Sequence, residues 1–462
     1  MAGRSCMTTP RATDVRRLTL AVLALAALAC GPVKKDSVAL VGGTVISGAG
    51  DAALPDAVVI IRAGRIEAVA ARADIEIPKH AEIIDVSGRW IVPGFIDGHA
   101  HVARWALNRY VAAGVTTVRD MHGIKDSILG LKEEAGLGGI VSPRIFTASA
   151  MIDGPGTTEL GATEVTSVSE ARRAVDDRAV AGVDYIKVGP LVTADLLKGV
   201  LDEAGTFSFR TAAHLGVVDA VAAATAGVSS IEHLTGIPEA ASRSPAALFE
   251  AHRKGKLPGW TAFERAWAAI DSASLHRVAT ALAESRVVLV PTLVMHETWS
   301  RLDDPAILSH PDLSTIPRVE LENWNVPALI ESAGWGTDVF AAFRASRPNQ
   351  DLFVREFRSA GGKLVAGTNA SQPMLIPGRS LHTELELLVA AGLTPLDAIQ
   401  TATHNAAQLL GADSLGMVAP GRVADLIILT ANPLADIRNT RAIERVMIRG
   451  QLYLADSLRT AF

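Results

Sequence analysis

The segment Pro93-Gly-Phe-Ile-Asp-Gly-His-Ala-His101 places an apolar strand directly before a pair of histidines. In an extended chain, side chains two positions apart point to the same side, so His99 and His101 face one way. Neutral imidazole is the most common metal ligand in proteins, and two such rings on one side can share one ion. The segment therefore predicts a buried strand that ends at a metal site.

Three further groups of this kind, Lys187, His214 and His233, end short apolar segments elsewhere in the chain. If these segments are parallel strands of a barrel, their carboxyl ends meet at one mouth, where barrel enzymes build their active sites. A lysine in that low-dielectric position is costly as a cation and can lose its proton. The neutral amine of Lys187 can then add CO₂, and the two oxygens of the carbamate can bridge two ions that hold a water and polarise a carbonyl.

The middle of the chain alternates short apolar segments with helix-like stretches, which is typical of βαβ units. The candidate strands begin at Gly94, Thr116, Arg144, Tyr185, Thr211, Ser230, Val287 and Lys363. These eight repeats predict an α/β fold, a (β/α)₈ TIM barrel over residues 93–416. A doubly wound open sheet is the competing fold, but no Gly-x-Gly-x-x-Gly motif or P-loop follows the first strand.

The two ends of the chain, residues 34–92 and 417–462, have a different pattern of short strands between Gly- and Asp-rich turns. The expected strands are Val38–Val41, Ala57–Arg62 and Arg65–Val69 at one end, and Ala424–Leu429 and Ile443–Gly450 at the other. We expect the two ends to pair into one small β-sandwich.

Two connections, at about 237–274 and 296–351, are longer than barrel loops usually are, and they hold five of the seven tryptophans. Long insertions after barrel strands commonly form lids or walls for a substrate. Exposed tryptophans would equally serve a contact between subunits, and the sequence leaves both interpretations open.

Residues 1–30 have the pattern of an export signal, in which basic residues up to Arg17 precede the apolar run Leu18–Ala29. The run is too short to span a bilayer comfortably but fits the core of a signal peptide. We therefore expect an exported protein, with Arg16-Arg17 as a weak indication of twin-arginine export.

The end of this signal, Ala27-Leu-Ala-Cys30, resembles a bacterial lipobox, with its leucine one place later than usual. A working lipobox would make Cys30 the lipidated N-terminus of a periplasmic or cell-envelope lipoprotein, whereas a plain signal cut near Ala29 would give a secreted protein. The other cysteine, Cys6, lies in the removed segment, so the mature chain has neither a disulfide nor a cysteine metal site.

The overall composition limits the class of partner. The chain has 462 residues, a formal net charge of −5 and a pI near 6.2. Both signs of charge are mixed along the sequence without a basic stripe, so we expect no binding of nucleic acid.

The motifs together resemble those of the amidohydrolase superfamily. The resemblance includes Pro93–His101, Tyr185-Ile-Lys187, Ala366-Gly-Thr-Asn-Ala370 and the histidines His214 and His233. Residues 381–395 and 401–407 are similar to the branch that contains imidazolonepropionase-like and Xaa-Pro dipeptidase-like enzymes.

The resemblance implies a distorted barrel with a composite β-sandwich and two divalent ions, usually Zn²⁺. His99 and His101 would bind the buried ion, a carboxylated Lys187 would bridge, and His214 and His233 would bind the outer ion. The implied reaction is attack of a metal-bridged hydroxide on an amide, peptide or cyclic amide, with dipeptides or N-acyl compounds as substrates. Homo-oligomers are also common among such proteins.

Position 369 departs from the family pattern, because Asn369 stands where an aspartate binds metal and accepts the proton of the water. An amide offers a neutral oxygen ligand but no general base near pH 7. The chain is then a weakened or catalytically impaired homologue that binds without turnover, an engineered variant that traps substrate, or an enzyme with another proton acceptor. Hydrolysis of an ester or lactone by the same site is a weaker hypothesis.

The remaining histidines receive smaller roles. His296 and His382 are the candidates for contact with substrate, and His122 is expected in a loop near the site. The histidines interpreted as surface residues are His80, His252, His276 and His310.

Overall fold

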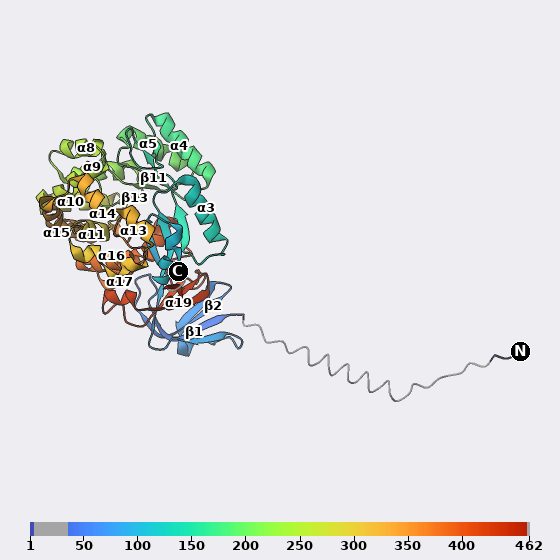
Figure 1. Cartoon of the computed structure of the whole chain (residues 1–462). Coiled ribbons are helices and arrows are strands. Elements are labelled where there is room, and N and C mark those ends of the chain that lie inside the picture. Colours follow the sequence, from blue (N-terminus) through green and yellow to red (C-terminus); the bar gives the residue numbers. More distant parts are fainter. Residues whose placement is uncertain (4–35, 460–462) are drawn as a thin grey trace.

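The computed structural model describes residues 1–3 and 36–459 (Figure 1). The predicted export signal, with Cys6 and Cys30, lies outside the described residues and stays a prediction. Among the described residues, no helix is long and apolar enough to cross a membrane.

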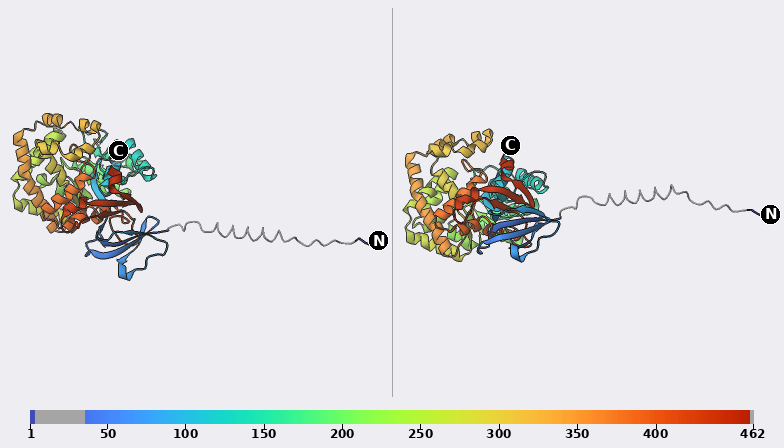
Figure 2. Two further views of the ribbon diagram at one scale, coloured as in Figure 1. Left: turned by 60° about the horizontal axis from the view of Figure 1, so that its bottom comes forward. Right: turned by 90° about the horizontal axis from the view of Figure 1, so that it is seen from below.

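Strands from the two ends of the chain form one sheet of eight strands. They are β1 (Val38–Val45), β2 (Leu54–Arg62), β3 (Arg65–Ala71), β4 (Glu82–Asp85), β5 (Trp90–Pro93), β16 (Leu426–Leu429), β17 (Ile443–Ile448) and β18 (Gln451–Leu454). The ends join where β16 pairs antiparallel with β5, with Leu426 opposite Pro93. The blue N-terminal and red C-terminal strands accordingly lie side by side, next to the barrel (Figures 1 and 2).

This sheet folds over onto a core of its own. A bridge between Arg65 and Val423 brings the β3 edge back to the segment before β16. Leu40, Val59 and Ile428, from strands of both ends, are buried in one apolar cluster between the two halves. The composite β-sandwich expected from the sequence is therefore confirmed, as a continuous sheet that encloses its core.

All eight predicted barrel strands are present, and they run parallel. They are β6 (Phe95–Ala100), β7 (Val115–Asp120), β8 (Arg144–Thr147), β11 (Ile186–Val188), β12 (Thr211–Ala213), β13 (Ser230–Glu232), β14 (Val288–Val290) and β15 (Lys363–Leu364). Two short additional strands, β9 (Ile152–Asp153) and β10 (Thr163–Glu164), extend the edge beside β11.

Backbone hydrogen bonds close the barrel between the two groups of strands. The amide of Gly98 in β6 donates to the carbonyl of Ala366, just after β15, at 2.9 Å. The amide of Asp184, just before β11, donates to the carbonyl of Thr147 in β8, also at 2.9 Å. The predicted distorted (β/α)₈ barrel is confirmed, and the distortion consists of strands that pair over only a few residues.

Helices cover the outside of the barrel and reach the sheet. They are α2 (Leu107–Ala112), α3 (Lys125–Gly136), α4 (Val168–Ala181), α5 (Ala194–Thr206), α6 (Ala220–Ala226), α10 (Ser272–Glu284), α15 (Thr337–Ser359), α16 (Arg379–Ala390), α17 (Pro395–Thr401), α18 (His404–Leu410) and α19 (Ala455–Arg459). Several begin at a side-chain cap, such as Ser167, whose hydroxyl accepts from the Glu170 amide before α4. Such caps fix the residue at which each helix begins after the preceding strand.

The two insertions are helical. They contribute α7 (Ile237–Ala241), α8 (Ala246–Arg253) and α9 (Lys256–Ala266), then α11 (Leu293–Trp299), α12 (Pro305–Leu308), α13 (Arg318–Trp324) and α14 (Val326–Ala333). Their tryptophans, expected to be exposed, are all buried: Trp260, Trp267, Trp299, Trp324 and Trp335. That expectation was wrong because α9 and α11 pack against α15 and enclose four of the indoles, while Trp324 is buried in a separate cluster with Ile316 and Ile376. The argument for a contact between subunits loses its basis.

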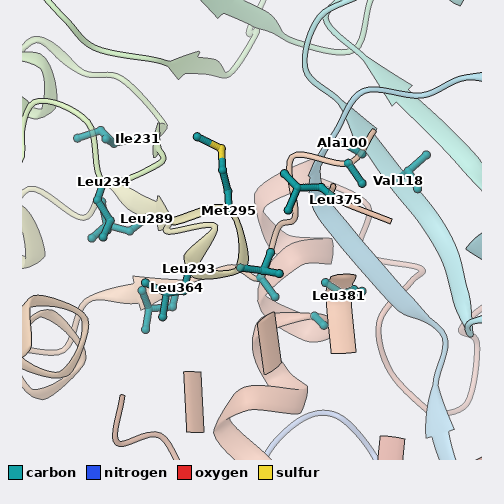
Figure 3. Packing of buried hydrophobic residues seen from close by; sticks show 14 of the residues in the cluster. Ala100, Val118, Ile231, Leu234, Leu289, Leu293, Met295, Leu364, Leu375 and Leu381 are labelled. Carbon is teal, nitrogen blue, oxygen red and sulfur yellow. The ribbon is translucent and has the colours of Figure 1, made fainter. Parts of the chain in front are cut away.

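Leucines from neighbouring strands pack below the barrel mouth. Leu234 and Leu289 lie together, with Leu293 and Leu364 close by (Figure 3). The first three are fully buried. Well-packed leucines of this kind typically contribute about 2–5 kcal/mol each to stability, measured as the cost of Leu→Ala, so the strand ends above them have a rigid base.

Candidate metal centre and active site

The five predicted ligands converge at the carboxyl end of the barrel. His99 lies in β6 and His101 just after it, Lys187 lies in β11, and His214 and His233 follow β12 and β13. All five line one cavity. The ring centroid of His99 is 4.2 Å from that of His233 and 5.7 Å from that of His101, and the rings of His214 and His233 are 5.1 Å apart.

Glu232 orients the His99 ring. Nδ1 of His99 donates to Oε2 of Glu232 at 2.7 Å, and both side chains are fully buried. The other carboxylate oxygen accepts from Ser230 at 2.6 Å and from Arg119 at 3.3 Å. Since the N–H of a neutral imidazole is used at Nδ1, Nε2 is left with its lone pair, the arrangement usual for a metal-binding histidine.

His101 faces the substituted position. Its Nδ1 donates to the His122 carbonyl at 3.1 Å, and its Nε2 lies 2.9 Å from Oδ1 of Asn369. Burial lowers the pKa of His101 to about 4, while the His122 hydrogen bond acts in the opposite direction. Nε2 of the neutral ring therefore points its lone pair at Oδ1 of Asn369, which is also an acceptor. A cation bound by both atoms would remove the repulsion, and so would a half-turn of the Asn369 amide that brings its NH₂ group to the ring.

Hydrogen bonds on the side away from the cavity fix the position of His233, and they involve residues of both insertions. Its Nδ1 lies 2.8 Å from the hydroxyl of Thr292, and its carbonyl accepts from Nε2 of His296 at 3.1 Å. Nδ1 of His296 bonds to the carboxylate of Glu264, which also accepts from Gln350 at 3.0 Å. His233 has a φ of 59°, a left-handed conformation that is unusual for histidine. The hydrogen bond from His296 to its carbonyl stabilises this strained backbone.

Lys187 is buried at the floor of the cavity. Its side chain is 4% exposed, and its Nζ has no hydrogen-bond partner among the described residues. Burial lowers the pKa of Lys187 to about 8, against the opposite effect of the Glu232 carboxylate. A buried amine with a lowered pKa and no partner is available for covalent modification.

His214 completes the set from the outer side of the cavity. Burial first, and then the charges of Lys187 and Lys256, lower its pKa well below the usual value. Burial likewise lowers the pKa of His233, with the neighbouring His99 and His214 adding to it. Both rings are therefore neutral, as metal binding requires.

The sequence model of the amidohydrolase family matches residues 90–453. The chain belongs to the amidohydrolase family. It is accordingly a hydrolase that acts on carbon–nitrogen bonds in small molecules, within a family that generally binds divalent metals.

Individual relatives of this amidohydrolase are distant. An imidazolonepropionase of Cereibacter sphaeroides is 27% identical over 394 residues, which cover 83% of this chain and 91% of that protein. The bottromycin amidohydrolase superposes with a TM-score of 0.71 at 23% identity, covering 95% of this chain and 91% of that one. A Xaa-Pro dipeptidase with bound methionine has a TM-score of 0.67 at 20% identity, covering 90% and 100%. The two solved structures establish the fold.

The residues present fit a divalent metal in part. Within residues 1–3 and 36–459, no group of three or more His, Cys, Asp or Glu side chains is arranged to hold an ion. Lysine falls outside such a set, although a carbamate on Lys187 would add the two oxygens that the histidines do not supply. The neutral rings, the contact of two lone pairs between His101 and Asn369, and the unpartnered Nζ of Lys187 are all properties that fit metal ligands.

The walls of the cavity in the amidohydrolase are mostly apolar. Trp260, Phe263 and Trp299 of the insertions line one side with Met295, so the insertions form a wall of the cavity, as one of the two sequence interpretations had it. At the mouth, Nζ of Lys256 lies 2.6 Å from Oε1 of Glu159.

The structure corrects the sequence analysis on three histidines. His252 is buried, bonds to Glu239 at 3.0 Å and lines the cavity, so its interpretation as a surface residue was wrong. His296 lies behind His233 with both ring nitrogens occupied and does not line the cavity. His382 is remote from it, bonding to Thr440 and to the Ala113 carbonyl between α16 and the sheet. His122 does line the cavity, as expected for a loop near the site.

Sequence reasoning missed the groups that act on the ligands from outside. Glu232 was within reach, since it ends β13 two residues after Ser230 and shares that side of the strand, where its carboxylate meets Ser230 and His99. Glu264, Lys256 and Glu159 carried no signal, because they come from an inserted helix and a loop whose positions relative to the barrel strands no sequence period encodes.

Proposed function

We propose that this amidohydrolase cleaves the amide bond of a dipeptide or N-acyl compound with two divalent ions, most commonly Zn²⁺. His99 and His101 would hold the inner ion, His214 and His233 the outer ion, and a carbamate on Lys187 would bridge them. When bound, the ions would supply an activated water and polarise the carbonyl of the substrate. The observation that carries the proposal is the convergence of these five side chains on one cavity.

The protein's own groups prepare this site. Glu232 and Thr292 orient the rings of His99 and His233, and the apolar wall around Trp260 excludes water and accepts an apolar side chain of the substrate. Asn369 can orient a water through its amide but cannot take its proton. Loss of a general base typically costs about 10²–10⁴ in rate, so we expect slow turnover.

The amide at position 369 also favours a second hypothesis, a catalytically impaired homologue that binds its ligand without turnover. Purified protein would be loaded with Zn²⁺ or Mn²⁺ and given a panel of Xaa-Pro dipeptides and N-acyl amino acids. Metal-dependent hydrolysis of any member supports the enzyme. Ligand binding without product over long incubation supports the impaired homologue, and neither binding nor product contradicts both.

We further propose export, with anchoring through a lipid on Cys30. Fractionation of a bacterial host that expresses the full chain tests this, with Cys30→Ser as the matched variant. Recovery of the wild type with the envelope and of the variant in soluble form is the expected result, and equal distribution of the two would exclude the anchor. The oligomeric state is measured on the same preparations.

A further inference from the structure

An ion pair connects the start of helix α9 to the loop between β9 and β10 at the cavity. Lys256 is the first residue of α9, and Glu159 lies between β9 and β10. Their side chains are 46% and 21% exposed, so solvent and small molecules reach the pair. An ion pair at that exposure contributes at most about 1 kcal/mol, which makes it easy to exchange one carboxylate for another.

Lys256 is part of the wall of the candidate metal centre. Both members of the pair line the cavity together with His101 and His214. These histidines belong to β6 and β12, which β7, β8 and β11 separate in the barrel. Histidines from well-separated strands and the Lys256–Glu159 pair therefore border one and the same cavity.

The rest of the lining contains little that would recognise a charged group. Its described residues include two lysines and two carboxylates, Lys187, Lys256, Asp153 and Glu159. Lys187 lies at the floor, and Oδ1 of Asp153 accepts from the amides of Gly154 and Leu191 at 2.8 Å each. Lys256 is therefore the one cation that these residues place at the mouth.

We propose that Lys256 selects substrates that carry a carboxylate beside the scissile amide, and that this carboxylate replaces Glu159 as its partner. The inference rests on the proposed function and names its substrate class, N-acyl amino acids and dipeptides with a free carboxyl end. The apolar part of the substrate then packs against Trp260 and Trp299, which lie on the same side of the cavity as α9. Before substrate arrives, Glu159 holds the ammonium in place.

The exchange predicts opposite effects for the two members of the pair. Lys256→Met removes the attraction, so we expect KM for an N-acyl amino acid to rise by up to about fivefold, the equivalent of one exposed ion pair. Glu159→Gln removes the competitor, so KM for the same compound falls. The matching N-acyl amino acid amide, which has no carboxylate, is handled alike by the wild type and both variants.

The test measures KM for both compounds, and isothermal titration of the metal-loaded protein with N-acetylphenylalanine and its amide gives Kd without any need for turnover. Lys254→Met, which removes an exposed lysine outside the lining, is the control. Loss of carboxylate affinity in the Lys256 variant alone supports the inference. Equal affinity for acid and amide in the wild type, or an unchanged Kd in Lys256→Met, overturns it. Binding as expected without turnover would instead count against the proposed hydrolysis.

Discussion

Nε2 of His101 and Oδ1 of Asn369 lie 2.9 Å apart at the mouth of the barrel. Asn369 thus faces the proposed metal site beside His101, with a side chain that has neither the charge nor the basicity of a carboxylate. Its φ of 61° is left-handed, a conformation that asparagine and aspartate both tolerate. The backbone therefore accepts aspartate without rearrangement.

Asn369→Asp should raise kcat by about 10²–10⁴ on any substrate that the wild type cleaves or binds. The measurement is kcat and KM at equal metal content. Asn325→Asp, which adds the same charge on the exposed N-cap of α14, should change neither. An unchanged rate in a fully metallated Asn369→Asp variant would mean that this position is not the defect.

Glu264→Gln should weaken both folding and metal binding. It would replace the carboxylate that bonds to the buried Nδ1 of His296, and loss of a buried hydrogen-bond partner costs about 1–3 kcal/mol. His296 donates a hydrogen bond to the His233 carbonyl and so positions this proposed ligand. Metal affinity should therefore also fall about 10- to 100-fold. Chemical denaturation of the metal-free protein and competition with a chelator measure the two effects.

The chain contains a matched control for this prediction. His276 and Glu356 form a pair at 2.8 Å on the surface, with His276 66% exposed. Glu356→Gln should cost at most about 1 kcal/mol and leave metal affinity alone. A Glu264 variant that behaves like the Glu356 variant in both measurements would show that the buried network does not position His233.

Glu384 should make stability depend on pH. Burial raises the pKa of Glu384 from 4.5 to about 8, although its hydrogen bond from the Val294 amide opposes the rise. Below pH 4.5 the carboxyl is protonated in both states. As pH rises from there to about 8, only the unfolded chain loses the proton, so this group lowers the free energy of unfolding.

Glu384→Gln removes that dependence, and the variant should gain stability relative to the wild type between pH 5 and pH 8. Urea denaturation at several pH values gives the difference, with the exposed Glu331→Gln as control. A constant difference across this pH range would show that Glu384 is ionised in the folded protein.

The sequence sufficed for the barrel and for the convergence of the five side chains on one cavity, because both follow strong local rules. The segment ending at His101 is an apolar strand with alternating side chains, and barrel strands present their carboxyl ends at one mouth. The same rule located Lys187, His214 and His233 without any knowledge of long-range contacts.

What the sequence did not reveal depends on tertiary packing. Glu264 and Lys256 belong to α9, an insertion whose place above the cavity is set by its contacts with α15. His252 has polar neighbours in the sequence, yet the fold buries it against Glu239. Burial of this kind is a property of the assembled helices, which composition and spacing do not encode.

A crystal structure of the protein grown with Zn²⁺ and bicarbonate, with anomalous data at the zinc edge, tests the central claim most directly. We predict two anomalous peaks between His99, His101, His214 and His233, joined by carbamate density on Lys187. A folded, zinc-saturated crystal with no peak among these side chains, or with an unmodified Lys187 and the metals bound elsewhere, would contradict it.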